Sequence, residues 1–340
     1  MTVLNMNLGD DSYPIIIEKG SLTRANEYFC LDRNVFIITD SGVPDIYARK
    51  IADLCKNATV YTVDEGEGSK SLSTLEAVLT AMSQSKLGRG DCVVAVGGGV
   101  VGDLSGFAAS IYMRGIDFYN VPTTLLSQVD SSIGGKTAVN LAGIKNIVGS
   151  FKQPKAVLID TDVLSTLSQR HLANGLCEAI KMAATSDPDL FERLESLDKN
   201  GIYDNIEEII IKALKIKRGV VEEDVCEKGP RRILNFGHTL GHGIEAVEGL
   251  GGLYHGECVA LGMLPVISGE AKCRLISLIK KVGLPTEYKG DIKAALSYVL
   301  HDKKCSGGLI SVVLCDKIGS CKIEKMSIDE FSKTVYNHYN

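Results

Sequence analysis

Residues 91-DCVVAVGGGVVGD-103 decide the fold of the first part of this chain. Residues 91–96 are rich in valine and other apolar side chains, which is typical of a buried strand. Gly97, Gly98, Gly99 and Gly102 follow at once and satisfy the spacing G-x-G-x-x-G. Glycine at these positions lets a strand turn tightly into a helix and present backbone N–H groups to a pyrophosphate. The pattern favours a phosphate-binding turn over a glycine-rich turn without a ligand.

A standard dinucleotide site has a second requirement, an acid that ends the next strand about 20 residues on. Asp117 lies at about that distance, but it begins the strand-like residues 117–121 and does not end them. We therefore expect a variant of that site.

The segments around this turn alternate between strand and helix. Apolar and β-branched runs predict strands at residues 13–18, 35–39, 59–63 and 91–96, and helical patterns predict helices at 45–56 and 72–87. The second helix is expected to begin after Ser71 and to end near Gly88. Such alternation predicts a parallel, doubly wound sheet, Rossmann-like in architecture.

After about residue 160 helical patterns dominate. We expect helices at residues 170–184, 189–197, 206–222, 238–246, 257–273 and 292–300, and a hairpin from 309–314 and 321–325. The chain is thus predicted to hold an α/β domain over residues 1–160 and a mostly α-helical domain over residues 161–340.

Composition excludes several classes of protein. The 340 residues carry 37 Lys and Arg against 42 Asp and Glu, and this net charge of −5 argues against a nucleic-acid partner. The sequence has no run of about 18 apolar residues, so we expect no membrane span. The ten cysteines are scattered without a C-x-x-C pair, and the first residues do not resemble a secretory signal, so we expect reduced thiols and a cytoplasmic protein.

Three histidines fall close together at His238, His242 and His255. The first two are four residues apart and share one face of a helix. Thr239 stands where a zinc protease of the H-E-x-x-H kind has its catalytic Glu, so that class is excluded. One of the pair, together with His255 and a carboxylate, would supply the three ligands of a catalytic zinc with an open position. The spacing leaves open which histidine of the pair binds.

Polar and charged residues within apolar or glycine-rich surroundings are further candidates. Glu178 and Lys181 lie three residues apart in GLCEAIKMAA, where a buried Glu would need a partner such as a metal. Residues 122–130 fit neither helix nor strand and could line a cofactor. Cations that could bind a phosphate or a carboxylate are Arg114, Lys136, Lys145, Lys181, Lys217, Arg231, Arg232, Lys303 and Lys304.

Eight stretches resemble the 3-dehydroquinate synthase family, a branch of the sugar phosphate cyclases. They are GGGVVGDLSGFAAS, YMRGI, VPTTLLSQVDSSIGGKTAVN, KNIVGSF, LCEAIK, RRILNFGHTLGHGIEA, HGECVALGM and DKK. They occur in the family's order, and the resemblance covers the chain from about residue 35 to residue 315. It implies the family's fold, with NAD bound by the α/β domain and with metal and substrate bound by the helical domain.

The resemblance also implies an activity. The substrate is 3-deoxy-arabino-heptulosonate 7-phosphate, and the products are 3-dehydroquinate and phosphate in the shikimate pathway. One NAD⁺ is reduced and reoxidised in each turnover, a divalent metal is bound (zinc, with cobalt as an alternative), and the enzyme is a homodimer. The reaction is an oxidation, a β-elimination of phosphate, a re-reduction and an intramolecular aldol closure.

Site residues follow from the same resemblance, position by position. The implied metal ligands are Glu178, His238 and His255. The implied catalytic polar groups are Lys181, Glu227, Asn235 and His242. The implied substrate contacts are Asp130, Lys136, Asn146, Lys217, Arg231, Lys303 or Lys304, and Arg114 from across a dimer interface. The implied NAD contacts are Asp40, Glu67, Lys70, Gly97, Gly98, Gly99, Val100, Val101, Gly102, Asp103, Thr123, Thr124, Leu126, Lys145 and Thr166.

Three other functions remain as alternatives to the implied one. A cyclase that makes an inosose or a valiolone would not need the carboxylate-binding cations Lys217 and Arg231. A glycerol-dehydrogenase-like enzyme would not need several cations and an amide around one phosphate. A catalytically inactive NAD-binding protein would be expected to have lost a ligand or the glycine turn, and neither is lost here.

Overall fold

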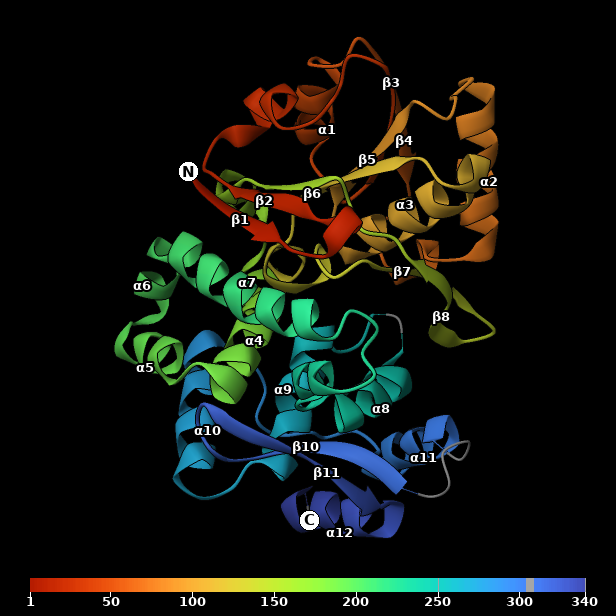
Figure 1. Cartoon of the computed structure of the whole chain (residues 1–340). Coiled ribbons are helices and arrows are strands. Elements are labelled where there is room, and N and C mark those ends of the chain that lie inside the picture. The colour runs from red at the N-terminus through yellow and green to blue at the C-terminus, as the bar shows by residue number, and fades with distance from the viewer. Residues whose placement is uncertain (250, 304–308, 340) are drawn as a thin grey trace. The chain divides into compact units, whose positions relative to one another are not determined.

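The computed structural model describes residues 1–249, 251–303 and 309–339, apart from the side chains of residues 300–303. The chain divides into two compact units, Met1–Ser168 and Gln169–Asn340, and Figure 1 labels their elements. The first unit extends past residue 160 because the short helix η6 (Thr161–Thr166) packs back onto it. Val163 joins a core of the sheet, and Tyr47 Oη lies 3.2 Å from Thr166 Oγ1.

The first unit is built on a seven-stranded sheet with the strand order β1-β2-β9-β6-β5-β3-β4. The strands are β1 (Thr2–Met6), β2 (Tyr13–Ile17), β3 (Asn34–Asp40), β4 (Asn57–Val63), β5 (Cys92–Gly97), β6 (Asp117–Pro122) and β9 (Ala156–Ile159). All neighbours are parallel except β1 and β2. The prediction of a parallel, doubly wound sheet is confirmed, whereas β1 and β9 were not predicted.

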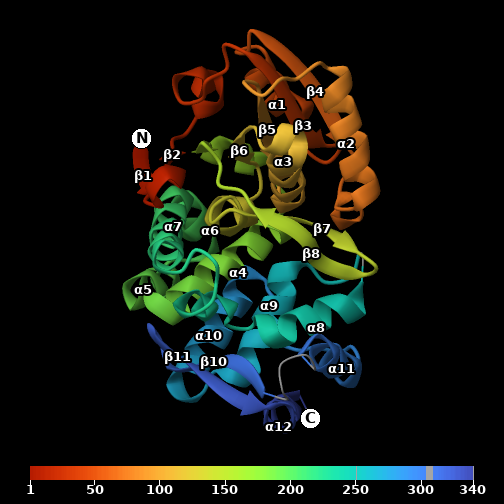
Figure 2. The ribbon, with the colours of Figure 1, turned by 45° about the vertical axis from the view of Figure 1, so that its right-hand side comes forward.

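Helices cover both faces of this sheet. Successive side chains of a strand point to opposite faces, so Ile37 packs with α1 (Asp45–Ala52), and Ile38 packs with α2 (Leu72–Gln84) and α3 (Gly99–Ile111). Figure 2 shows α2, α3 and the strands together. The two faces bury separate apolar cores, and the long valine and isoleucine runs of β3 and β5 supply both.

The bounds of α2 correct the sequence analysis at one end. The helix begins after Ser71, whose hydroxyl accepts the Thr74 N–H at 3.2 Å, as expected for an N-cap. It ends at Gln84 and not near Gly88, because Lys86 takes a left-handed conformation with φ 57° and breaks the helical ladder. The Gly88 N–H is instead bound by the Asp91 carboxylate at 2.6 Å.

An unpredicted hairpin, β7 (Lys136–Leu141) and β8 (Ile144–Phe151), packs beside α3. Gly106 of α3 permits this packing, because a Cβ atom there would overlap the Thr137 side chain. Residues 122–130 were expected to be irregular. They hold the end of β6, a turn and a short π-helix, η5 (Ser127–Ser131).

The second unit is mostly helical, as expected. Its helices are α4 (Gln169–Ser186), α5 (Pro188–Ser196), α6 (Lys199–Asp204), α7 (Ile206–Glu223), α8 (His238–Glu248), α9 (His255–Met263), α10 (Gly269–Val282), α11 (Ile292–Lys303) and α12 (Ile328–Tyr339). The single helix predicted at residues 257–273 is wrong. Pro265 removes a backbone donor in the short helix η8 (Leu264–Val266), and Ile267 is extended, so α9 and α10 are separate helices.

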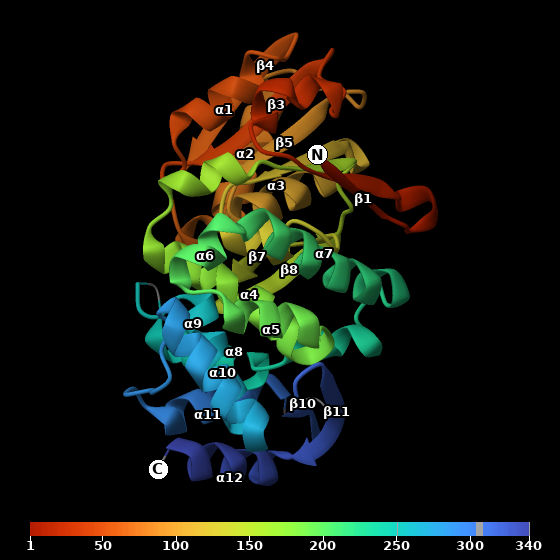
Figure 3. The same ribbon diagram turned by 90° about the vertical axis from the view of Figure 1, so that its left-hand side faces the viewer.

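The predicted C-terminal hairpin is present as β10 (Leu309–Lys317) and β11 (Ser320–Ser327). Helices α10 and α12 pack against this hairpin (Figure 3). Helix α12 was not predicted. Within residues 1–249, 251–303 and 309–339, no helix has both the length and the apolar character that crossing a bilayer requires.

Candidate metal centre and nucleotide-binding turn

Helix α4 buries an ion pair in the second unit. Most residues from Leu172 to Thr185 are inaccessible to solvent, and they include both Glu178 (0% exposed) and Lys181 (1% exposed). Lys181 Nζ contacts Glu178 Oε2, one helical turn away. Neither carboxylate oxygen of Glu178 accepts a hydrogen bond of regular geometry. A buried carboxylate with unused lone pairs is costly unless another cationic ligand completes it.

Two histidines at the starts of neighbouring helices face that carboxylate. His238 begins α8 and His255 begins α9. Their Nε2 atoms lie 3.8 and 3.6 Å from Glu178 Oε1, respectively. The three donor atoms all lie within 4.8 Å of one another. The two helices approach closely because Gly262 leaves room for the backbone oxygen of Gly237.

This donor set fits a divalent metal. Two imidazole nitrogens and one carboxylate are the protein ligands of many catalytic zinc sites, which keep a further position open. The Glu178 oxygens also accept no regular hydrogen bond and could bind such an ion. The spacing of the two histidines on α8 left the choice between His238 and His242 open, and the geometry places His238 with Glu178 and His255.

The second nitrogen of each histidine also has a partner. His238 Nδ1 lies 3.2 Å from the Phe236 carbonyl oxygen, and His255 Nδ1 lies 3.3 Å from Glu245 Oε2. With the proton on Nδ1 in each ring, the Nε2 lone pair would be available to a metal ion beside Glu178. Glu245 was not singled out from the sequence, although it lies in the stretch HTLGHGIEA. Its spacing of seven residues from His238, two helical turns on the same face, was the available signal.

The charges of the cluster reinforce one another. Burial opposes ionisation of Glu178, but the Lys181 ammonium and the imidazoles hold the pKa of its carboxyl well below the usual range. Burial and the nearby Lys181 lower the pKa of His238 well below its usual value, which keeps that ring neutral. Burial alone would lower the pKa of His255, but Glu178 and Glu245 raise it to about 10. Carboxylates that favour a proton on His255 also favour a divalent cation beside it.

The structure brings other predicted residues of the second unit together in two places. Asn235 Nδ2 donates to Glu227 Oε1 at 2.6 Å, and both line a cavity of about 410 Å³ against β10 and β11. His242 is exposed, and its ring centroid lies 5.2 Å from that of His238. Thus Glu227 pairs with Asn235, and His242 adjoins the metal cluster.

Two cations of this unit are buried. Lys217 of α7 is 5% exposed and Arg231 of η7 (Pro230–Asn235) is 3% exposed. Arg231 Nη1 donates to the Val225 carbonyl oxygen at 2.6 Å. The prediction for Lys304 lies outside the described residues, and so does the prediction for the side chain of Lys303.

In the first unit the glycine turn has the predicted form. β5 ends at Gly97 and α3 begins at Gly99. A Cβ atom at Gly97 would lie 2.5 Å from Val101 Cγ2, and one at Gly98 would lie 3.1 Å from Thr124 Cγ2. Larger residues would therefore push the turn apart, and the turn leads directly into the first N–H groups of α3, the kind of group that binds anions at helix N-termini.

A polar network lies beside this turn. Lys70, only 5% exposed, donates to Asp103 Oδ2 at 2.5 Å and also to Asn146 Oδ1. Asn140 connects the network further, because its Nδ2 donates to Glu67 Oε1 at 2.8 Å and its Oδ1 accepts the Asn146 N–H at 2.9 Å. The structure thus unites four predicted residues, and it adds Asn140, which the sequence analysis missed although it ends the quoted stretch GGKTAVN.

The remaining predicted positions of the first unit lie on several elements, and some of them adjoin the glycine turn. Asp40 ends β3, where its Oδ1 accepts the N–H groups of Gly42 and Val43, and burial raises its pKa. Thr166 bonds to the Val163 carbonyl oxygen at 3.0 Å. Arg114 is exposed and has a left-handed φ of 71°. Val100, Val101 and Gly102 form the first turn of α3. Thr123 and Thr124 adjoin the glycine turn, since the Thr123 N–H donates to the Gly97 carbonyl oxygen at 2.9 Å and Thr124 faces Gly98. Leu126 precedes η5, and Asp130, Lys136 and Lys145 lie on η5, β7 and β8.

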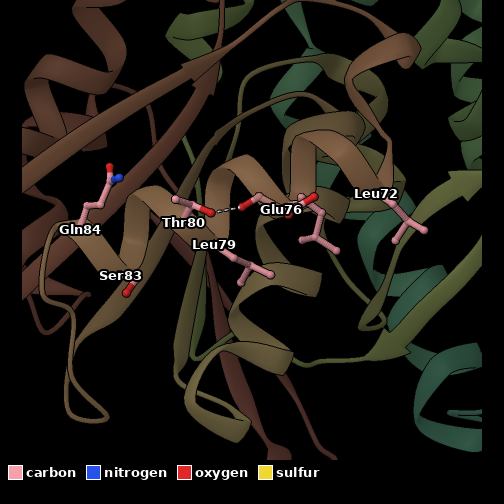
Figure 4. A pocket seen from close by; sticks show the side chains of 7 residues that line it. Leu72, Glu76, Leu79, Thr80, Ser83 and Gln84 are labelled. Carbon is pink, nitrogen blue, oxygen red and sulfur yellow. Dashed lines mark hydrogen bonds between the residues drawn. The ribbon is translucent and has the colours of Figure 1, made fainter.

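A groove of about 530 Å³ on α2 does not share this chemistry. Its lining comes from one helix and consists of Leu72, Leu75, Glu76, Leu79, Thr80, Ser83 and Gln84 (Figure 4). The Thr80 hydroxyl is already bonded to the Glu76 carbonyl oxygen at 2.8 Å. With a carboxylate and no cation in its lining, the groove does not suit a phosphate.

Comparison with known proteins agrees with these features. Residues 60–174 match the family model described as 3-dehydroquinate synthase N-terminal, and residues 175–305 match the one described as 3-dehydroquinate synthase C-terminal. A 3-dehydroquinate synthase of Streptococcus sanguinis is 43% identical over 97% of this chain and 98% of its own. The chain belongs to the 3-dehydroquinate synthase family.

Solved structures place this member of the 3-dehydroquinate synthase family among sugar phosphate cyclases. A 2-deoxy-scyllo-inosose synthase complexed with carbaglucose-6-phosphate, NAD⁺ and Co²⁺ has a TM-score of 0.90 and 27% identity, covering 99% of this chain and 100% of that one. The 2-epi-5-epi-valiolone synthase of Streptomyces hygroscopicus, with NAD⁺ and Zn²⁺ bound, has a TM-score of 0.84 and 26% identity, covering 97% and 98%. The predicted fold class is confirmed.

Proposed function

We propose that this protein is a 3-dehydroquinate synthase, which converts 3-deoxy-arabino-heptulosonate 7-phosphate to 3-dehydroquinate and phosphate. Family membership supports this reaction. The observation that carries it in this chain is the buried cluster of Glu178, His238 and His255, because a cyclase of this kind needs a metal at the hydroxyl that is oxidised.

The proposal assigns the metal to Glu178, His238 and His255. A divalent ion held there, Zn²⁺ or Co²⁺, would lower the pKa of a bound substrate hydroxyl. Lys181, buried beside Glu178, balances the negative charge of that carboxylate and sets its orientation. His242, next to the cluster and exposed, is suited to a hydrogen bond with a second substrate hydroxyl.

The proposal assigns NAD⁺ to the first unit, where it would supply the hydride acceptor and, later in the same turnover, the donor. Gly97, Gly98 and Gly99 bring the N–H groups of the first turn of α3 to the pyrophosphate. Lys70 and Asp103 form a charged pair beside that turn and can orient the polar part of the cofactor. The matching positions for further NAD contacts are Asp40, Glu67, Val100, Val101, Gly102, Thr123, Thr124, Leu126, Lys145 and Thr166.

The substrate has a phosphate and a carboxylate, and we assign cations to each. Lys217 and Arg231 are buried, where a charge-assisted bond to a carboxylate is strongest. For the phosphate the assigned groups are Lys136, Asn146, one of Lys303 and Lys304, and Arg114 supplied by the partner of a homodimer. Glu227 and Asn235 orient one another and would fix the reacting ring, together with Asp130. The leaving phosphate can accept the proton removed in the elimination, so these groups act by orientation and electrostatics.

The test is phosphate release from 3-deoxy-arabino-heptulosonate 7-phosphate by the full chain with catalytic NAD⁺. We expect release that a chelator abolishes, with no net formation of NADH. Net NADH from glycerol without phosphate release would instead identify a dehydrogenase. Turnover of glucose 6-phosphate in place of the heptulosonate would identify an inosose-type cyclase, the second candidate that the structural likeness favours.

A matched pair of variants on α7 tests the carboxylate assignment. Lys217 is buried, whereas Lys215, on the same helix, is exposed. Lys217→Met should raise KM for the heptulosonate about 10-fold or more, since a buried charged hydrogen bond is lost. Lys215→Met should leave KM unchanged. Equal KM values in both variants would remove Lys217 from the substrate site.

A further inference from the structure

The hairpin of β10 and β11 holds two cysteines directly opposite one another. In the register of the two strands Cys315 pairs with Cys321. These strands lie beyond residues 60–305, the part of the chain that the two family models match. Nothing in the proposed reaction uses either thiol, so the pair needs its own explanation.

The geometry of the pair suits a disulfide. Directly opposed residues of antiparallel strands have Cα atoms about 4.5 to 5.5 Å apart, which lies inside the range of about 4.4 to 6.8 Å that disulfides require. Both sulfur atoms also approach the same carbonyl oxygen, that of Ala184 in α4, at 3.7 Å for Cys315 and 3.8 Å for Cys321. The two thiols therefore project from the same side of the hairpin toward a common point.

The two thiols differ in access to solvent. Cys315 is 0% exposed, and Cys321 is partly exposed. A small oxidant thus reaches Cys321 first, and Cys315, directly opposite it, is placed to attack the oxidised Cys321 sulfur.

We propose that Cys315 and Cys321 form an oxidisable dithiol that closes to an intrachain disulfide when the protein meets a peroxide. The Cys321 sulfur attacks one peroxide oxygen, which gives a sulfenic acid and releases the first water. The Cys315 sulfur then attacks the sulfenic sulfur, which forms the S–S bond and releases the second water. The two thiols lose two electrons and two protons, and the peroxide O–O bond is reduced. A thiol reductant reverses the change by disulfide exchange.

The fold can accept this bond without releasing the hairpin. The Gly319 N–H, in the turn between the two strands, donates to the Ala184 oxygen at 2.8 Å, and that bond does not involve either sulfur. The Ser268 N–H holds the Cys315 carbonyl oxygen at 3.1 Å, so the backbone of β10 remains anchored to the residue before α10. Oxidation therefore removes the weak S–H contacts of the two thiols with the Ala184 oxygen and leaves these backbone attachments of the hairpin in place.

The experiment treats metal-loaded full-length protein with excess hydrogen peroxide, removes the peroxide, unfolds the protein in denaturant so that buried thiols become accessible, blocks the remaining thiols with N-ethylmaleimide and measures the intact mass. Before blocking, we expect a fraction of the protein that is about 2 Da lighter, and after blocking the same fraction should carry two fewer N-ethylmaleimide groups. Dithiothreitol should restore the original mass. Lys317 lies between the two cysteines, so trypsin separates them unless they are bonded. The tryptic peptide of Cys315, residues 305–317, also holds Cys305, so fragment ions of a joined peptide that appears only under non-reducing conditions must place the bond on Cys315 to establish the pair.

Variants complete the test. Cys321→Ser should remove the reversible 2 Da loss, and Cys273→Ser, which changes an exposed thiol on α10, should retain it. The proposal is overturned if Cys315 and Cys321 of the wild-type protein both remain open to alkylation after peroxide, or if the tryptic map joins another pair. The wild-type map decides even if Cys321→Ser does not fold, and no outcome depends on catalytic activity.

Discussion

Replacing Glu245 by Gln should weaken metal binding without changing the ligands. His255 Nδ1 lies 3.3 Å from Glu245 Oε2, and the Glu245 side chain is only 14% exposed, so solvent screens this contact weakly. The carboxylate holds the proton on Nδ1 and leaves Nε2 to the metal. A glutamine keeps the size of the side chain and loses the charge.

The expected magnitude comes from the role of such partners. Loss of a carboxylate that orients a ligating histidine costs about 10- to 100-fold in metal affinity, which corresponds to about 1.4 to 2.7 kcal/mol. Glu248→Gln is the matched control. Glu248 lies on the same helix and accepts a hydrogen bond from Tyr288 Oη at 2.9 Å, so its loss removes an equal charge but no contact with a metal ligand.

The assay titrates metal-free protein with Co²⁺ or Zn²⁺ against a chromophoric chelator, and circular dichroism checks the fold of each apo-protein. The visible spectrum of the Co²⁺ form reports the ligands themselves. We expect a weaker dissociation constant for Glu245→Gln, an unchanged one for Glu248→Gln and the same Co²⁺ spectrum in both. Equal affinities in the two variants would refute the orienting role. A changed spectrum in Glu245→Gln would show that Glu245 is itself a ligand, in the second donor group that it forms with His242 and His255.

Three further predictions concern stability. Glu178→Gln should lower the free energy of unfolding of the metal-free protein by about 3 to 5 kcal/mol because it removes the carboxylate that contacts the buried Lys181 ammonium, and adding Lys181→Met should recover most of the loss in a urea titration. Gly262→Ala should lower the free energy of unfolding by about 1 to 3 kcal/mol, since the new Cβ would overlap the backbone oxygen that precedes α8. Gly219→Ala, on α7 with open space around it, should instead raise the free energy of unfolding by about 0.5 to 1 kcal/mol. Equal thermal shifts in the two variants would contradict this account. Burial raises the pKa of Asp91, but hydrogen bonds from the backbone outweigh burial and hold the pKa below its usual value. The stabilisation that the ionised Asp91 gives to the folded state is therefore present above about pH 4 and is lost as the pH falls through the lowered pKa. Wild type and Asp91→Asn should therefore differ most in stability near neutral pH and converge in acid, and a difference that grows in acid would reverse the assigned sign.

Several features of this protein could be predicted from the sequence because neighbouring residues determine them. The strand, glycine turn and helix of residues 91–111 depend on β-branched side chains followed by residues without a Cβ atom, and the structure reproduces them as β5 and α3. The same holds for the buried strand β3 and for the hairpin of β10 and β11. The shared helix face of His238 and His242 likewise follows from the helical repeat alone.

Other features depend on residues that are distant in the sequence. The helical repeat presents His238 and His242 equally, and only the position of Glu178, contributed by another helix, distinguishes them. Asn140 has no local signal stronger than that of any exposed polar residue, and Glu245 has only its helical spacing from His238, because the significance of both lies in the partners that they meet.

The same reasoning applies to the ends of elements and to the cysteine pair. The apolar pattern of residues 257–273 continues across Pro265, but the backbone does not, because proline cannot donate the next helical hydrogen bond. Cys315 and Cys321 are two of ten scattered cysteines in the sequence, and strand register alone makes them neighbours. Local chemistry thus determined which elements form, and packing between distant segments decided which side chains meet, because burial and charge pairing depend on partners that the chain brings together only when it folds.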